Sequence, residues 1–265
     1  MRRKILFIFV TIALMLLVAL PASAVVWGQP DGDAHPYVVN VVFDVDGFPS
    51  HRCSASFLNE EWLLTAGHCT FGTSGARVYT DNPYTNDPGY PFSGGLDAIP
   101  ITHPAYDNFA TFPNTSDVGL LQLTSDSWDG PTANLPDLGA VDDAYQPHGN
   151  RGGEMIIVGF GVQGIVPNPN IVQADPYRYN ADPMIVELNS ANSGGFNIHL
   201  SSNPGKGNGS GGACFGDSGG PALIGDSDTI GGVGSFVLNL NCVGAGFYYR
   251  VDTVHAQDFL NMYLP

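Results

Sequence analysis

Three short motifs contain residues whose side chains could carry out nucleophilic catalysis. Ser218 lies in "CFGDSGGP", residues 214–221, where glycines on both sides of the serine permit a tight turn. Such a turn can aim several backbone N–H groups at one point and stabilise a negatively charged oxygen there. Serine is a weak nucleophile until a base removes its proton, so this interpretation requires a histidine and an acid that orients it.

A histidine and an aspartate stand in contexts that suit these roles. Among the seven histidines, His68 follows the apolar stretch "WLLTAG" and precedes Cys69, where a disulfide would hold the imidazole in place. Asp117 begins "DVGLLQL", and a carboxylate at the start of a buried strand can be shielded from water while it orients a histidine. Each motif alone also has a purely structural explanation, as a glycine-rich turn, a packed histidine or a turn aspartate.

The elements that must position these residues are predominantly strands. Short apolar segments alternate with clusters of Gly, Pro, Asn and Asp, and no regular alternation of strands with helices is visible. This pattern predicts an all-β barrel or sandwich. One helix is expected near the C-terminus, capped by Asp252 or Thr253. The best boundary between two halves lies near residues 140–152, "AVDDAYQPHGNRG".

The N-terminal region has the features of a secretory signal peptide. Three basic residues at positions 2–4 precede an apolar run over 5–20, and Ala22-Ser23-Ala24 offers small residues at a cleavage site. An uncleaved membrane anchor is the alternative, but the run is short for a span of about 20 residues. We therefore expect a secreted chain that begins at Val25, with one domain over 25–145 and a second over 146–265.

Charge and cysteine content restrict the partners and the compartment. The formal net charge is −16, and three of the nine basic residues lie in the expected signal peptide. So acidic a chain argues against nucleic acid or an anionic membrane as a partner. The simplest explanation of the acidic net charge is solubility outside the cell. Attraction of cationic substrates and calcium binding are alternative explanations. Four cysteines in an exported chain predict disulfides, but counting leaves three connectivities open.

Taken together and in this order, "LTAGHC", "DVGLLQL" and "GDSGGP" resemble the chymotrypsin/trypsin family of serine peptidases. Residues 35–43, 158–161, 232–237 and 247–254 also resemble family segments, so the similarity covers nearly all of the expected mature chain. The resemblance implies two six-stranded antiparallel β-barrels, an active site in the cleft between them and a C-terminal helix. Other disulfides that are common in animal members of the family are missing, and in this smaller number of disulfides the chain resembles bacterial members.

The resemblance also implies a role for each candidate residue. His68 would act as general base and then general acid, Asp117 would orient it, and Ser218 would be the nucleophile. The N–H groups of Gly216 and Ser218 would form the oxyanion hole. The implied disulfides are Cys53–Cys69 and Cys214–Cys242. We expect a monomeric secreted endopeptidase that cleaves proteins or peptides through an acyl-enzyme, without a cofactor or metal.

Two other functions fit parts of the pattern. A catalytically silent binding protein on the same fold would usually lack a member of the triad, whereas all three matching positions are intact here. An esterase with a G-x-S-x-G serine matches the glycine spacing around Ser218. However, the acid precedes the nucleophile in this chain, and the strand–helix alternation of such esterases is absent.

By the same resemblance, six residues would line the primary substrate pocket. A trypsin-like member carries an acid six residues before the serine, but this chain has Gly212, which disfavours cleavage after Arg or Lys. Val237 should narrow the pocket entrance while Gly246 keeps some depth, so we predict small to medium apolar side chains. The full set of expected pocket residues is Gly212, Ala213, Ser235, Phe236, Val237 and Gly246.

The stretch "VVWG" at residues 25–28 resembles the N-terminus that proteolysis frees in this family. The resemblance implies that the α-ammonium of Val25 pairs with Asp217 and sets the oxyanion turn. Removal of the signal peptide would then itself activate the protein. Trp27 departs from the family pattern at the third place, and the alternative is that Val25 is a plain terminus.

Overall fold

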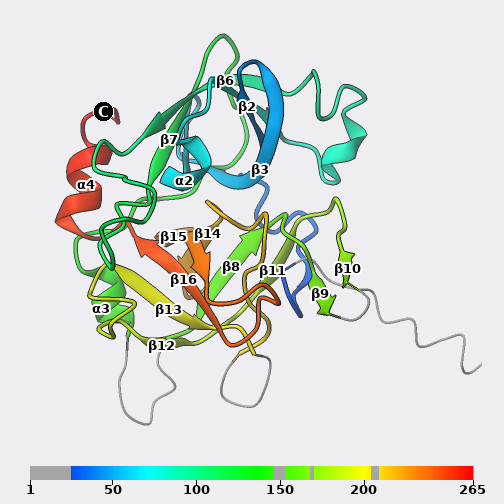
Figure 1. The fold of residues 1–265 in the computed structure, drawn as a ribbon. Helices are drawn as coiled ribbons and strands as arrows, with labels where there is room; N and C mark the ends of the chain where they lie inside the picture. The colour runs from blue at the N-terminus through cyan, green and yellow to red at the C-terminus, as the bar shows by residue number, and fades with distance from the viewer. Residues whose placement is uncertain (1–24, 146–152, 168–169, 204–208, 265) are drawn as a thin grey trace, which may run out of the picture.

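The computed structural model describes residues 25–145, 153–167, 170–203 and 209–264. The expected signal peptide lies outside these residues. The described chain forms two β units, one above the other in Figure 1. The all-β class is therefore confirmed.

The first unit is a closed barrel of six antiparallel strands. The hairpin that begins it turns at Asp46-Gly47, where φ values of 53° and 82° match the type I′ turn that an Asp-Gly pair favours. Apolar residues fill the interior, and every residue of the strand that leads toward His68 is buried. In order around the barrel, the strands are β2 (Val38–Val45), β3 (Phe48–Phe57), β4 (Trp62–Thr65), β7 (Gly119–Leu123), β6 (Leu96–Thr102) and β5 (Gly75–Tyr79).

The second unit is an eight-stranded sheet, so the prediction of two six-stranded barrels holds for the first unit only. The segments that precede the strands Met155–Gly159 and Ile185–Glu187 are joined by an isolated bridge between Glu154 and Met184 rather than by a strand ladder. Pro183 lies beside this bridge and has no N–H to donate, which fits the interruption. The strand order is β1 (Gln29–Pro30), β11 (Tyr179–Ala181), β8 (Met155–Gly159), β14 (Pro221–Ile224), β15 (Ile230–Val237), β16 (Ala245–Arg250), β13 (Asn197–Ser201) and β12 (Ile185–Glu187).

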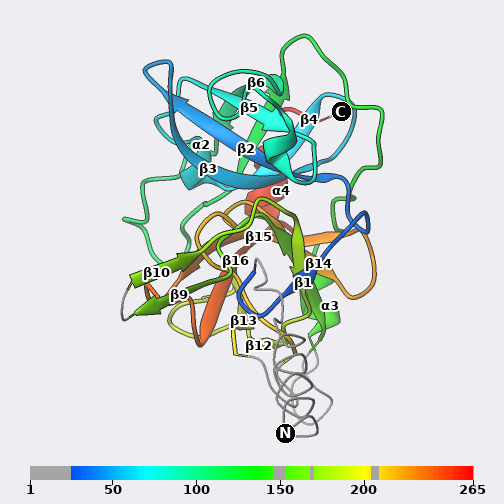
Figure 2. The ribbon, with the colours of Figure 1, turned by 90° about the vertical axis from the view of Figure 1, so that its right-hand side faces the viewer.

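The N-terminal segment belongs to the second unit. Strand β1 pairs with β11, and Figure 2 shows this segment beside the lower sheet, away from the barrel that follows it in sequence. A separate hairpin of β9 (Gly164–Pro167) and β10 (Asn170–Gln173) projects from the same sheet.

The helices are short. The expected C-terminal helix is α4 (Val254–Leu260), and the Thr253 side chain caps it by accepting a hydrogen bond from Ala256 N. Its buried face packs against the core, and Tyr263 contacts Trp62 of β4 with ring centroids 5.9 Å apart. The others are α2 (Gly67–Thr70), the 3₁₀ turn η1 (Tyr84–Asn86) and α3 (Ala140–Ala144), which the sequence did not predict. Within the described ranges, no helix has the length and apolarity needed to cross a membrane.

Candidate active site

His68 lies on α2, directly after the buried strand β4. A Cβ atom at Gly67 would lie 3.1 Å from Val118 N and 3.3 Å from Asp117 Cα, so glycine lets this turn approach the Asp117 segment closely. The neighbouring Cys69 is bonded to Cys53 of β3, one of the two disulfides that the resemblance implies. The helix that carries His68 is thus held to both sides of the barrel.

Asp117 is fully buried and accepts hydrogen bonds from three donors. His68 N donates to Oδ1 at 2.7 Å, and His68 Nδ1 lies 2.9 Å from Oδ2. Ser235 of β15 donates from Oγ to Oδ2 at 2.5 Å, a contact that the sequence did not reveal. Because these donors come from both β units, Asp117 couples the position of His68 to the substrate-side strand.

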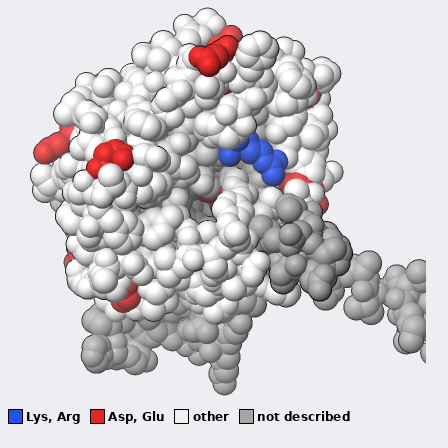
Figure 3. Space-filling view, viewed as in Figure 1, with Lys and Arg blue, Asp and Glu red and all other residues white. Residues whose placement is uncertain are grey.

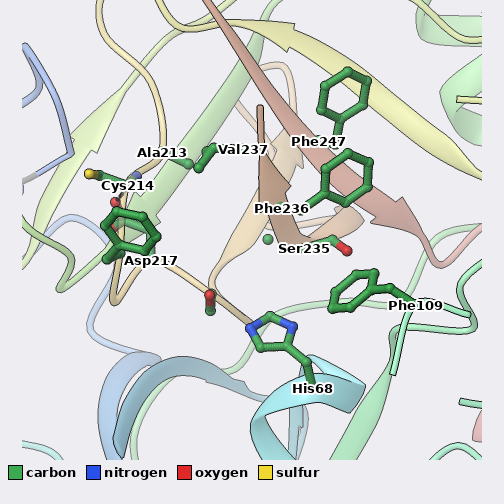
Figure 4. A pocket seen from close by; sticks show the side chains of 12 residues that line it. His68, Phe109, Ala213, Cys214, Asp217, Ser235, Phe236, Val237 and Phe247 are labelled. Atoms are coloured by element: carbon green, nitrogen blue, oxygen red, sulfur yellow. Dashed lines mark hydrogen bonds between the residues drawn. The ribbon is translucent and has the colours of Figure 1, made fainter. Parts of the chain in front are cut away.

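The pKa of His68 lies above its ordinary value. Burial acts to lower it, but the charge of Asp117 and the hydrogen bond to that carboxylate outweigh burial. With Nδ1 directed at Asp117, Nε2 is the nitrogen left to accept a proton. His68 and Ser218 line the same pocket, and Figure 4 shows the imidazole at one edge of it. No hydrogen bond between Nε2 and Ser218 Oγ occurs in this described pocket, as is common before substrate binds.

The turn around Ser218 leaves two of its backbone N–H groups without a backbone partner. The carbonyl groups of Gly216 and Ser218 point toward β3, where Ser54 donates to them from Oγ at 2.9 Å and from N at 2.8 Å. The N–H groups of Gly216 and Ser218 make no backbone hydrogen bond in the described chain. The φ of +99° at Gly216 favours glycine, and a Cβ there would lie 3.0 Å from Gly161 Cα.

Asp217 is buried beneath this turn. Its carboxylate accepts hydrogen bonds from Gly161 N and Cys214 N, each at 2.8 Å. Burial raises its pKa to about 7, although both backbone donors and the charge of Arg52 act in the other direction. Side chains at Gly159 or Gly161 would overlap this carboxylate, so the glycines of the "VGFG" segment provide its space.

The Val25 segment is inserted into the second unit. Val25 and Val26 are buried, and Gly212 N donates to Val26 O at 2.9 Å. Val25 packs in the same apolar cluster as Ala213 and Tyr248. Burial raises the pKa of Tyr248, and the charge of Asp217 adds to this effect. Trp27, the departure from the family pattern, points outward with 63% of its surface exposed.

The pocket beside Ser218 has a volume of about 320 Å³. Four of the six expected pocket residues line it, namely Ala213, Ser235, Phe236 and Val237. Phe247 stacks on Phe236 at 4.6 Å between ring centroids, and Phe109 from the β6–β7 loop completes an aromatic wall (Figure 4). Neither Phe247 nor Phe109 was singled out from the sequence, because distant loops and strands bring them here.

The other two expected pocket residues, Gly212 and Gly246, lie behind the lining. A Cβ at Gly246 would lie 3.7 Å from Ala213 Cβ and 3.2 Å from Ser202 Oγ, and a Cβ at Gly212 would overlap Ser202. Ser202 is 1% exposed, and its Oγ has no hydrogen-bond partner in the described structure. Ser202 therefore occupies the space that a larger side chain at Gly212 would need, and no local sequence signal indicated this.

One other cluster contains side chains of metal-binding type. Cys53, His68 and Cys69 bring a ring nitrogen and two sulfurs within 4.8 Å of one another. Both sulfurs belong to the Cys53–Cys69 disulfide, whereas a metal requires thiolates. This cluster is therefore a structural support for His68 rather than a metal centre. The second disulfide, Cys214–Cys242, fixes the start of the Ser218 turn.

The fold and this pocket define a chymotrypsin-like serine protease, and comparisons with known proteins agree. The family described as Trypsin matches residues 26–257. Serine protease 1 of Drosophila melanogaster is 28% identical over 214 residues, which cover 78% of this chain and 72% of that protein. The chain belongs to the trypsin family of serine proteases.

Solved structures show the same fold at low sequence identity. A structure titled HL collagenase is similar with a TM-score of 0.68 and 17% identity, over 92% of this chain and all of that one. Human heparin binding protein is similar with a TM-score of 0.64 and 17% identity, over 91% and 96% of the two chains. Curated relatives come from fly, mosquito and mouse, so the expected kinship with bacterial members is not supported.

Proposed function

We propose that this protein is a serine endopeptidase in which His68, Asp117 and Ser218 form the catalytic triad. The observation that carries the proposal is the buried Asp117–His68 pair beside a serine whose turn has two unpaired backbone N–H groups. The raised pKa of His68 favours proton uptake at the moment when a serine alkoxide would form.

The proposed reaction proceeds in two halves. Ser218 Oγ attacks the peptide carbonyl carbon while His68 Nε2 takes its proton, and the carbonyl oxygen becomes an oxyanion that the N–H groups of Gly216 and Ser218 stabilise. The imidazolium then gives its proton to the leaving amine as the C–N bond breaks, which leaves an acyl ester on Ser218. Water attacks this ester with His68 again as base, and the acid product leaves as Ser218 regains its proton.

The pocket favours small to medium apolar side chains on the acyl side of the cleaved bond. Val237 and Ala213 line the pocket, whereas Gly212 and Gly246 do not. We infer from this that the pocket does not extend past Val237 and Ala213 to the two glycines, so its depth is limited. No carboxylate lies among its lining residues except Asp217, which the backbone of Gly161 and Cys214 already binds. A long cationic side chain would therefore find neither the depth nor the counter-charge that it needs.

Removal of residues 1–24 would activate the protein by freeing Val25. The segment is seated beside Gly212 in the second unit, and Asp217 has a raised pKa that an ammonium partner would relieve. Val25 has a φ of +58°, which is strained for a β-branched residue. That torsion is defined by the carbonyl carbon of residue 24, so cleavage between 24 and 25 removes the strained torsion. We also propose that the protein is secreted as a monomer, and the two disulfides support export because such bonds persist in oxidising compartments.

A fluorophosphonate serine probe tests the proposal against the silent-binding alternative. Protein that begins at Val25 should be labelled at Ser218, and Ser218→Ala should abolish labelling. Ser227→Ala is the matched control, because Ser227 lies in the exposed turn between β14 and β15, outside the pocket, and its loss should leave Ser218 reactive. Absence of label on the unmutated protein, located by peptide mapping, would refute the proposed nucleophile.

A further inference from the structure

Arg52 differs from the other described cations in its lack of an acidic partner. In the ranges that the structure describes, it forms no ion pair, whereas each of the other three arginines does. Those pairs are Arg77 with Asp44, Arg178 with Asp31, and Arg250 with Asp142 and Asp252. The charge of Arg52 acts on the buried Asp217 without forming an ion pair with it. A half-buried arginine without an ion pair, in a chain of net charge −16, suggests that an anionic partner comes from outside.

The position of the Arg52 guanidinium is held by one aromatic residue. Arg52 NH1 donates to the Tyr84 hydroxyl, and its Cζ lies 5.5 Å from the centroid of the Tyr84 ring. Tyr84 is buried and packs against Phe160 and Tyr90. Arginine has five N–H donors, so this arrangement orients the group and leaves donors for a ligand.

Arg52 lies beside the oxyanion turn and is not part of the lining of the apolar pocket. Its Nε lies 3.7 Å from the Cβ position of Gly216, and Ser54, two residues along β3, binds the carbonyls of Gly216 and Ser218. Arg52 also lines a second hollow of about 330 Å³, together with His51, Tyr90 and Phe92. This hollow shares no lining residue with the apolar pocket, and Arg52 is the lining residue that approaches the Ser218 turn.

Figure 3 shows how charge is distributed on this face. Basic atoms of the described residues lie at the edge of a central hollow, and acidic atoms are visible both beside them and within the hollow. The acidic surface elsewhere would repel an acidic peptide, so Arg52 is the position at which the protein would select such a peptide.

We propose that Arg52 forms a subsite for an acidic side chain, Asp or Glu, on the leaving-group side of the cleaved bond. This inference rests on the proposed function, in which the acyl side occupies the apolar pocket and the leaving group extends from Ser218 in the other direction. The carboxylate lies within the first two residues after the cleaved bond, since Arg52 borders the oxyanion turn itself. A charged hydrogen bond to guanidinium then adds to the backbone contacts of the substrate.

Internally quenched peptides with a fixed apolar residue before the bond test this subsite. Glu, Gln and Lys are placed in turn at the first and second positions after the bond, and kcat/KM is measured for each. Native protein should prefer Glu to Gln by about fivefold at low salt at one of these positions, and less at high salt. Arg52→Gln should remove this preference, Arg52→Lys should keep part of it, and Arg52→Glu should favour Lys.

An anilide substrate, which carries only a chromogenic amine after the cleaved bond, tests the proposed peptidase activity independently of the Arg52 subsite. Failure to cleave any apolar substrate would count against the proposed peptidase itself. Anilide cleavage without a Glu preference in the native protein would overturn the Arg52 subsite alone. Arg52 also lowers the pKa of Asp217, so an equal loss for all peptides in Arg52→Gln would instead assign Arg52 a structural role and overturn the proposal.

Discussion

The free amino group of Val25 should stabilise the protein by compensating the buried carboxylate of Asp217. The comparison uses two proteins, one that begins at Val25 and one that retains Ala24 before it. Both carry Ser218→Ala, which prevents self-digestion. In the extended form Val25 N is part of a peptide bond, so Asp217 is left with its two backbone donors and the more distant charge of Arg52.

The size of the effect follows from the shift in the pKa of Asp217. Burial raises it from 3.8 to about 7, and each unit corresponds to about 1.4 kcal/mol. Because the folded state binds this proton more tightly, stability in the extended form is highest below pH 3.8. It then declines as pH rises toward 7, by about 4 kcal/mol in all. The charge of a free Val25 ammonium would lower the pKa of Asp217 and restore most of this energy.

Thermal unfolding between pH 4 and pH 9 measures the difference. The two forms should have similar midpoints near pH 4 and differ by about 10 °C near pH 7.5, given about 2–4 °C per kcal/mol for a chain of this size. The ammonium should have a pKa above the usual 7.7–8.0 because it pairs with Asp217, so the advantage should fade as pH rises through that value. A difference that is independent of pH, or unchanged by Asp217→Asn in both forms, would refute the pairing.

Three further predictions concern the pocket. Ser235→Ala removes the 2.5 Å hydrogen bond to Asp117, so kcat for an apolar anilide should fall by about tenfold with little change in KM; an unchanged kcat would show that this bond does not support His68. Val237→Gly should deepen the pocket and raise the kcat/KM ratio of Phe over Ala substrates by about tenfold or more, measured with paired peptides. Gly212→Asp should lower the unfolding midpoint without producing cleavage after Lys, because Ser202 occupies the required space. The double variant with Ser202→Gly should recover only part of the lost stability, because Ser202 Cα would still lie 2.5 Å from the new Cβ, and efficient Lys cleavage by the single variant would contradict this account.

Local patterns in the sequence were sufficient for the parts of the site that depend on neighbouring residues. The glycines around Ser218 indicated a tight turn, and the structure has φ values of +99° and +75° at Gly216 and Gly219. The apolar run before His68 indicated the buried strand that carries it. The all-β class followed from strand density, and the C-terminal helix from its cap. The assignment of catalytic roles to His68, Asp117 and Ser218 remains a prediction for the labelling experiment.

Tertiary structure alone decided the contacts between segments that lie far apart in the chain. Ser235 reaches Asp117 across 118 positions, and Ser202 limits the space behind Gly212 from a neighbouring strand. Periodicity reports which face of a strand is buried, but not which distant side chain it meets there. The same limit hid the position of Arg52 beside Gly216, because that contact exists only once the barrel and the sheet pack together. Local patterns in the sequence thus predicted the family, the all-β class and the reactive residue types, whereas packing between the two β units sets the surroundings of each charged group.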